Sequence, residues 1–107
     1  MIVAFSVAPS GDPQPGHQGE AGDGSVHEAV AAAVKVVRES GLPNRTGSMF
    51  TEIEGEWEEV FDVVRRATEA VAPFGSRISL VIKADIRSGR SGELDGKVQR
   101  LEASLGD

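Results

Sequence analysis

Cysteine is absent from the 107-residue sequence, and its absence excludes several kinds of chemistry at once. Without a thiol there is no disulfide framework, no thiolate-bound metal and no cysteine nucleophile, and the composition fits a reducing compartment. Basic residues are also few, because 11 lysines and arginines stand against 17 aspartates and glutamates, giving a net charge of −6. Nucleic acid is therefore not an expected partner, since attraction to phosphate dominates affinity for it.

Long apolar runs are also absent. No run approaches the length of a membrane span, and the apolar first residues lack the basic region of a secretory signal. We therefore expect a cytoplasmic protein with no membrane partner. With 39% hydrophobic and 26% charged residues, the composition is that of a globular protein, and the length is that of one domain over residues 1–107.

A catalytic arrangement is not visible in the sequence. There is no recognisable triad of serine, histidine and aspartate, and neither histidine lies on an element that would orient it. The two histidines and the acids around them lack the spacing of a metal-ligand set, so we expect no metal. These residues are His17, Glu20, Asp23, His27 and Glu28. We expect a protein that is not an enzyme and has no cofactor.

The spacing of apolar residues predicts the order of the elements. Residues 2–8 alternate in the manner of a central strand, and residues 78–86 alternate as a second long strand. Helical spacing predicts helices over residues 25–40 and 56–71, and segments 44–48 and 51–54 are typical of a short hairpin. Leucines and a valine within residues 94–105 predict a short terminal helix.

Residues 10–24 are rich in glycine and proline and contain no large apolar side chain. A segment of this composition has nothing to bury, so we expect a flexible insertion. Ser25 and Glu28 form a capping box that predicts the start of the first helix directly after it. In the second helix, Trp57 stands at helical spacing and is expected in the core.

The predicted order, βαββαβ, is that of an α+β ferredoxin-like sandwich. Its four-stranded antiparallel sheet has two helices on one face, and here a short C-terminal helix follows. The other face of the sheet stays uncovered and semi-polar, with Val81 between Ser79 and Lys83. Because such faces bury one another when they stack, we expect a homo-oligomer.

Several segments form a specific combination when they are taken together: AFSVAP (4–9), RESGLPNRT (38–46), MFTEIEGEWEEV (49–60), VVRRATEAV (63–71) and SLVIKADIR (79–87). They resemble the thiamine-binding protein family, also called DUF77 or UPF0045. The combination of IEGEW before a helix with IKADIR in the last strand is the specific part. The resemblance covers nearly the whole chain except the loop after the first strand, where the family usually has a short turn.

The resemblance implies a ferredoxin-like fold, tetramers built from sheet-paired dimers, and non-catalytic binding of thiamine or its hydroxymethylpyrimidine part in the cytoplasm. Thiamine joins an aminopyrimidine, which needs hydrogen bonds and an apolar slot, to a cationic thiazolium, which favours carboxylates. Glu54, at a junction between strand and helix, is well placed to face a ligand. The expected ligand-binding residues are Ser6, Thr46, Thr51 and Ser79 for neutral hydrogen bonds, Met49 and Phe50 for the slot, and Glu54 or Asp85 for the charge.

Two other functional classes stay open at this point. A ferredoxin-like regulatory or interaction module, binding another small molecule or a protein partner, would have the same sheet and oligomer. An acylphosphatase-like hydrolase would need an anion-binding loop with a fixed arginine and a positioned asparagine, and the loop after the first strand contains neither. Non-catalytic binding of a thiamine-like molecule is therefore the expected function.

Overall fold

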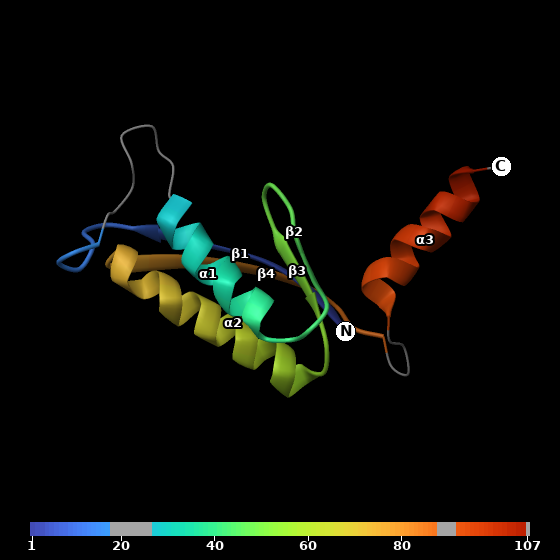
Figure 1. Ribbon diagram of the computed structural model, residues 1–107, viewed down its shortest axis with the longest axis horizontal. Coiled ribbons are helices and arrows are strands. Elements are labelled where there is room, and N and C mark those ends of the chain that lie inside the picture. The colour runs from blue at the N-terminus through green and yellow to red at the C-terminus, as the bar shows by residue number, and fades with distance from the viewer. Residues whose placement is uncertain (18–26, 88–91, 107) are drawn as a thin grey trace.

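The protein is built on a four-stranded sheet in the order β2-β3-β1-β4, with helices α1 and α2 on one face (Figure 1). The computed structural model describes residues 1–17, 27–87 and 92–106. Its elements are β1 (Ile2–Ser10), α1 (His27–Glu39), β2 (Asn44–Thr46), β3 (Thr51–Glu54), α2 (Trp57–Val71), the 3-10 turn η1 (Ala72–Phe74), β4 (Arg77–Asp85) and α3 (Glu93–Leu105). All strand pairs are antiparallel. The ferredoxin-like α+β prediction is confirmed.

The core lies between the sheet and the two helices. Alternate residues of the central strand β1 face the helices, so Val3, Phe5 and Val7 are buried. Ile53 of β3 pairs with Val3 and is fully buried beside it. Small and branched residues three and four apart on the helices complete the cluster: Ala29, Ala33, Val37, Val60, Val63, Val64, Ala67 and Val71.

Trp57 lies outside this core, so the expectation that it would be buried is wrong. Its indole ring stacks on Phe61 with ring centroids 5.3 Å apart, and 52% of its surface is exposed. The apolar stripe of α2 runs through Val60, Val64 and Val71, and Trp57 extends it one turn beyond the last core residue. Helical spacing predicts that Trp57 shares a face with the core residues, but it does not tell where the sheet below that face ends.

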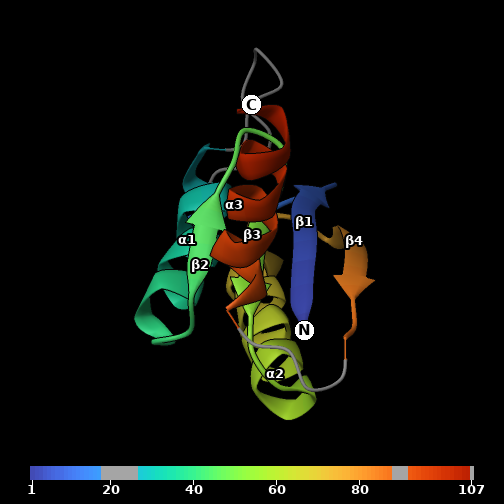
Figure 2. The same cartoon turned by 90° about the vertical axis from the view of Figure 1, so that its right-hand side faces the viewer.

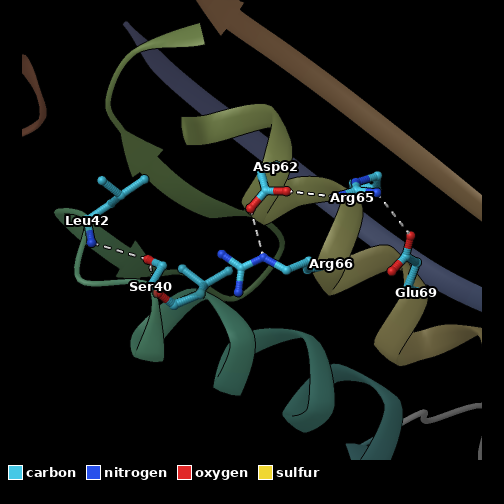
Figure 3. Close-up of polar contacts among 7 residues, drawn as sticks. Ser40, Leu42, Asp62, Arg65, Arg66 and Glu69 are labelled. Atoms are coloured by element: carbon cyan, nitrogen blue, oxygen red, sulfur yellow. Dashed lines mark hydrogen bonds and ion pairs between the residues drawn. The ribbon is translucent and has the colours of Figure 1, made fainter. Parts of the chain in front are cut away.

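Polar contacts terminate α1 after Glu39 (Figure 3). The hydroxyl of Ser40 donates to the carbonyl oxygen of Val37 at 2.6 Å and accepts the N–H of Leu42 at 3.2 Å. Gly41 follows in the left-handed region with φ +81°, which costs glycine nothing. The chain can therefore turn sharply from α1 into β2.

The exposed face of α2 carries a ladder of ion pairs around Asp62 (Figure 3). Arg65 and Arg66 donate to the two oxygens of Asp62 at 2.8 and 2.9 Å, and Arg65 also lies 3.9 Å from Glu69. The hydrogen bond from Arg65, assisted by Arg66, holds the pKa of Asp62 below its ordinary value of 3.8. The same bond raises the pKa of Arg65. Pairs at this spacing add a modest stabilisation to the helix.

Strand β4 is an edge strand with apolar side chains exposed on both of its faces. Leu80 and Ile82 pair with Val7 and Phe5 on the helix side of the sheet, as the alternation predicts. They nevertheless remain 39% and 38% exposed, and Val81 on the opposite face is 52% exposed. The helices bury the neighbouring strand β1 and leave much of β4 open to solvent.

Helix α3 starts over the sheet face opposite α1 and α2 and then extends away from the domain (Figures 1 and 2). Leu94 in its first turn is buried, but Val98, Leu101 and Leu105 are increasingly exposed. The helix predicted from this apolar stripe is therefore present, and it packs through one end only. Within the described ranges, no helix is both long and apolar enough to span a membrane.

The start of the predicted insertion at 10–24 contacts the η1 turn. The main-chain N–H of Gln14 donates to the carbonyl oxygen of Pro73 at 2.8 Å. The ring of His17 packs edge-on against Phe74, with centroids 5.2 Å apart. Residues 18–24 of the insertion, and Ser25 of the predicted capping box, lie outside the described residues.

Candidate functional site

A cavity of about 100 Å³ lies between α1, β1 and the β2–β3 hairpin, and we call it the hairpin pocket. Helix α1 supplies an apolar wall, and the hairpin supplies hydroxyl groups together with two large apolar side chains. The lining residues are Phe5, Ser6, Val7, Val30, Ala33, Val34, Thr46, Gly47, Ser48, Met49, Phe50 and Thr51. An apolar cavity with a few convergent polar groups is the usual form of a small-molecule site.

The hairpin holds its side of the pocket through a tight turn. Thr46 pairs with Thr51, and the N–H of Gly47 donates to the carbonyl oxygen of Phe50 at 2.9 Å. A Cβ atom at Gly47 would come within 3.0 Å of that same oxygen, so the close approach favours glycine. The turn places Phe50 and the largely exposed Met49 at the mouth of the pocket.

The main chain of β1 adds polar groups beside this pocket. The ladder between β1 and β3 ends at the pair of Phe5 and Thr51, whereas β1 continues to Ser10 with β4 on its other side. Successive residues of a strand direct their N–H and C=O groups to opposite neighbours. One of Ser6 and Val7 therefore directs a donor and an acceptor toward the pocket that both residues line.

The structure brings together part of the predicted ligand-binding set. Residues from two segments far apart in the sequence, β1 and the hairpin, meet in the hairpin pocket, namely Ser6, Thr46, Met49, Phe50 and Thr51. Glu54, Ser79 and Asp85 are not among its lining residues. In the strand register they lie on the opposite sheet face, where Ser79 is exposed beside Ala8. The side chain of Ser6 also lies on that face, because Ser6 pairs with Val81.

Glu54 and Asp85 flank the same residue of β1 and both contact α3. Each is the register partner of Ile2, one from β3 and one from β4. The Glu54 carboxylate is only 7% exposed and accepts the main-chain N–H of Glu93 at 2.6 Å. Asp85 pairs with Lys97, and this hydrogen bond holds the pKa of Asp85 below its ordinary value of 3.8. The two candidate carboxylates therefore hold the terminal helix.

A second cavity, of about 220 Å³, lies beneath α3 on that face. Its walls combine apolar residues with lysines and acids from the sheet and from α3. They are Ile2, Ala4, Glu52, Lys83, Asp85, Leu94, Lys97 and Val98. Arg45 pairs with Asp95 nearby, and Arg100 lies 2.6 Å from Glu93. The charges of opposite sign in this region largely neutralise one another.

An outer groove of about 690 Å³ runs along α1 and adjoins the hairpin pocket. Val30, Val34 and Ser48 line both spaces. The other groove residues are His27, Ala31, Lys35, Arg38 and Glu39. The Arg38 guanidinium donates to the hydroxyl of Thr46 at 3.5 Å, so this cation lies at the boundary of the two spaces.

Sequence reasoning missed the α1 side of this site. Lys35 and Arg38 are exposed on α1, and helical spacing alone places them only on the solvent-facing side of the helix. Two cations spaced three residues apart beside an apolar stripe are the signal that could have indicated them. In the part of the chain that the structure describes, no group of three or more histidines, aspartates or glutamates could hold a metal ion, and Glu20 and Asp23 lie outside that part.

Comparison with known proteins identifies the family. Residues 3–102 match the family described as thiamine-binding protein, which covers most of the chain. The chain belongs to the thiamine-binding protein family. A UPF0045 protein of Mycobacterium bovis is 48% identical over 106 residues, which cover 98% of this chain and 94% of that relative.

Solved structures of similar proteins agree with this family assignment. A domain of unknown function, DUF77, from Bacillus cereus superposes with a TM-score of 0.74 at 30% identity, covering 92% of this chain and 86% of that one. A Thermotoga maritima protein, named for an assumed role in thiamine biosynthesis or salvage, superposes with a TM-score of 0.72 at 26% identity, covering 94% and 96%. The resemblance inferred from the motifs is thereby confirmed, and the role of this chain is thiamine-related.

Proposed function

We propose that this chain is a non-catalytic cytoplasmic binding protein for thiamine or its hydroxymethylpyrimidine part, and that the pyrimidine ring binds in the hairpin pocket. The observation that carries the proposal is the convergence of Ser6, Thr46 and Thr51 with Met49 and Phe50 on one cavity. Family membership supports the ligand class. The lack of cysteine fits the reducing compartment.

The chemistry of the pocket suits an aminopyrimidine. The apolar walls of Val30, Ala33 and Phe5 can contact the faces of a flat ring. The hydroxyls of Thr46 and Thr51 and the main chain of β1 supply the donors and acceptors that ring nitrogens and an amino group require. Such groups discriminate strongly, because a ligand without matching atoms would leave them unpaired.

The hairpin pocket is large enough for only one part of a two-ring ligand. A volume of about 100 Å³ is small compared with the roughly 300–1,000 Å³ of a site for a drug-sized molecule. It suits one ring, so the remainder of a two-ring ligand such as thiamine would occupy the outer groove. The charged residues that line this groove are the acid Glu39 and the cations Lys35 and Arg38.

Titration calorimetry with the hydroxymethylpyrimidine tests the proposed pocket. Replacing Thr51 by valine keeps the side-chain shape and removes one hydroxyl, so affinity should fall by about 1 kcal/mol. Ser79→Ala removes a hydroxyl from the opposite sheet face and is the matched control, with unchanged affinity. Equal affinities for both variants, with unchanged melting temperatures, would exclude Thr51 from the site.

We further propose that the chain is a homo-oligomer, a dimer or a tetramer, through β4 and the adjoining open face. The exposed Leu80, Val81 and Ile82 support this, because an apolar edge strand invites pairing with another copy. Light scattering at micromolar concentration should give a multiple of the single-chain mass. Val81→Asp should lower that mass while the chain stays folded, and a single-chain mass for the unaltered protein overturns this part of the proposal.

The absence of catalysis is tested separately. Thiamine incubated with the protein for hours should be recovered unchanged when it is followed by proton NMR. Any enzyme-dependent product, absent from a heat-denatured control, would contradict the assignment as a binding protein. A thermal-shift plate containing other small molecules distinguishes the thiamine-like ligand from that of a regulatory module, since a ligand bound only by the folded state raises the melting temperature.

A further inference from the structure

The outer groove carries two cations that lack a carboxylate partner. Across the described residues, five cations form ion pairs, namely Arg45, Arg65, Arg66, Lys97 and Arg100, whereas Arg77, Lys83 and Arg87, which lie outside the groove, do not. Lys35 and Arg38 form none, although Glu39 lies in the same groove. Two uncompensated cations beside a cavity are notable in a chain whose net charge is −6.

We propose that this groove binds a phosphate ester, so that the preferred ligand is a phosphorylated form of the pyrimidine or of thiamine. The inference rests on the proposed function, because it places the ring in the hairpin pocket. Arg38 and Lys35 would then hold the phosphate at the pocket's mouth. Guanidinium and ammonium groups are the usual donors to phosphate oxygens, and their hydrogen bonds to an anion are stronger than neutral ones.

The position of Arg38 gives the strongest geometric support. Its guanidinium donates to the Thr46 hydroxyl at 3.5 Å, and Thr46 is itself a wall of the hairpin pocket. This contact is a long one and leaves other N–H donors of the guanidinium available. Lys35 lies three residues earlier on α1 and therefore on the same side of the helix. A group attached to a ring in the pocket would emerge between them.

Charge complementarity favours an anion over a cation in this groove. Lys35 and Arg38 together outweigh Glu39, so the groove has a positive balance when His27 is neutral. A thiazolium ring alone would meet this balance with repulsion, whereas a phosphate would be attracted. The carboxylates that could have faced a thiazolium, Glu54 and Asp85, hold α3 on the other face of the sheet.

Titration calorimetry with five probes tests the inference: hydroxymethylpyrimidine, its phosphate ester, thiamine, thiamine phosphate and inorganic phosphate. Each phosphate ester should bind about tenfold or more tightly than its unphosphorylated counterpart at low ionic strength. That gain should shrink as salt is added, because exposed charges are screened. Inorganic phosphate should bind far more weakly than either ester, because it lacks the ring.

Paired variants assign the effect to residues. Lys35→Gln with Arg38→Gln should remove the tenfold gain, so that each phosphate ester binds this variant no more tightly than its unphosphorylated counterpart does. Arg77→Gln is the control, since Arg77 is an exposed cation on β4 away from the groove, and it should keep the gain. Melting temperatures and masses of all variants are measured to verify folding and assembly.

The outcomes separate this inference from the proposed function. If the unphosphorylated pyrimidine binds and the phosphate adds nothing, the phosphate site is overturned and the pyrimidine pocket stands. If no pyrimidine or thiamine compound binds at all, the proposed function fails and the inference fails with it. If inorganic phosphate binds as tightly as the esters, or the gain survives in the double variant, the groove does not select a phosphorylated ligand through Lys35 and Arg38.

Discussion

The carboxylate of Glu54 accepts the main-chain N–H of Glu93 at 2.6 Å, and this bond joins the end of β3 to the first residue of α3. The residue before the helix, Gly92, offers no side chain that could cap it. Glu54 thus supplies from another strand the acceptor that a helix N-terminus requires, and its negative charge also suits the helix dipole.

Replacing Glu54 by alanine should destabilise the docked α3 by about 1–3 kcal/mol, because a buried main-chain donor loses its partner. Glu54→Gln keeps an acceptor oxygen and should cost less. Amide chemical shifts of α3 would report the change. Neither variant should alter affinity for thiamine more than about twofold, and a selective loss of thiamine binding in Glu54→Gln would instead support a carboxylate facing the thiazolium.

Gly75→Ala should lower the stability of the whole domain by about 1–3 kcal/mol, as overpacking does. A Cβ atom at Gly75 would lie 2.5 Å from the main-chain oxygen of Ser10 and 2.8 Å from its nitrogen, and neither is free to move. Gly96→Ala is the matched control. There the new Cβ meets only the flexible Arg100 side chain at 3.3 Å, so the helix should gain about 0.5–1 kcal/mol. Urea titrations of both variants provide the comparison.

Ile53→Ala should cost about 2–5 kcal/mol, since Ile53 is fully buried and its truncation leaves a cavity. Trp57→Ala removes a larger side chain and should still cost less, because half of that ring is already exposed. Chemical denaturation followed by circular dichroism orders the two variants without relying on tryptophan fluorescence. A larger loss of stability in Trp57→Ala than in Ile53→Ala would indicate that Trp57 is buried, for example against another copy of the chain.

Acid should release α3 before it unfolds the domain. The hydrogen bond from Lys97 holds the pKa of Asp85 below its ordinary value of 3.8, so the ion pair stabilises the docking of α3 at pH values above 3.8. This stabilisation is lost as the pH falls through the lowered pKa of Asp85. Amide shifts of α3 should therefore move below about pH 4. Asp85→Asn should reduce that step, and the part that remains is due to the other carboxylates that hold α3, those of Glu54, Glu93 and Asp95. Asp62→Asn, which affects a carboxylate on α2 with a similarly lowered pKa, should leave it intact.

Much of the fold was predictable because the spacing of apolar residues along the chain determines which segments form helices and strands. The alternation of residues 2–8 predicted a central strand, and Val3, Phe5 and Val7 form its buried face. The hairpin and both covering helices followed from similar patterns. The exposure of Leu80 and Trp57 was not predictable in the same way. Periodicity tells which side chains share a face, whereas burial depends on how far a neighbouring element extends over that face.

Some residues of the candidate site were likewise predictable from local sequence, and others were not. Thr46, Phe50 and Thr51 could be predicted because they lie together in a hairpin within a family motif. The partner of Glu54 could not, since it lies 39 residues later in a helix whose direction no local pattern specifies. A strand-to-helix junction indicates that a side chain has a special environment, but it does not tell whether that environment is a ligand or another part of the chain.

Helix α3 is attached through Leu94 and a few polar contacts, and this has a consequence for native-state hydrogen exchange. A segment that buries so little apolar surface opens locally at a small fraction of the free energy of global unfolding. The amides of α3 should thus exchange by sub-global opening, while those of β1 and α2 exchange only when the whole domain unfolds. The terminal helix then forms a separate cooperative unit. A molecule or a second copy of the chain that binds over Val98 and Leu101 would slow the hydrogen exchange of the α3 amides alone.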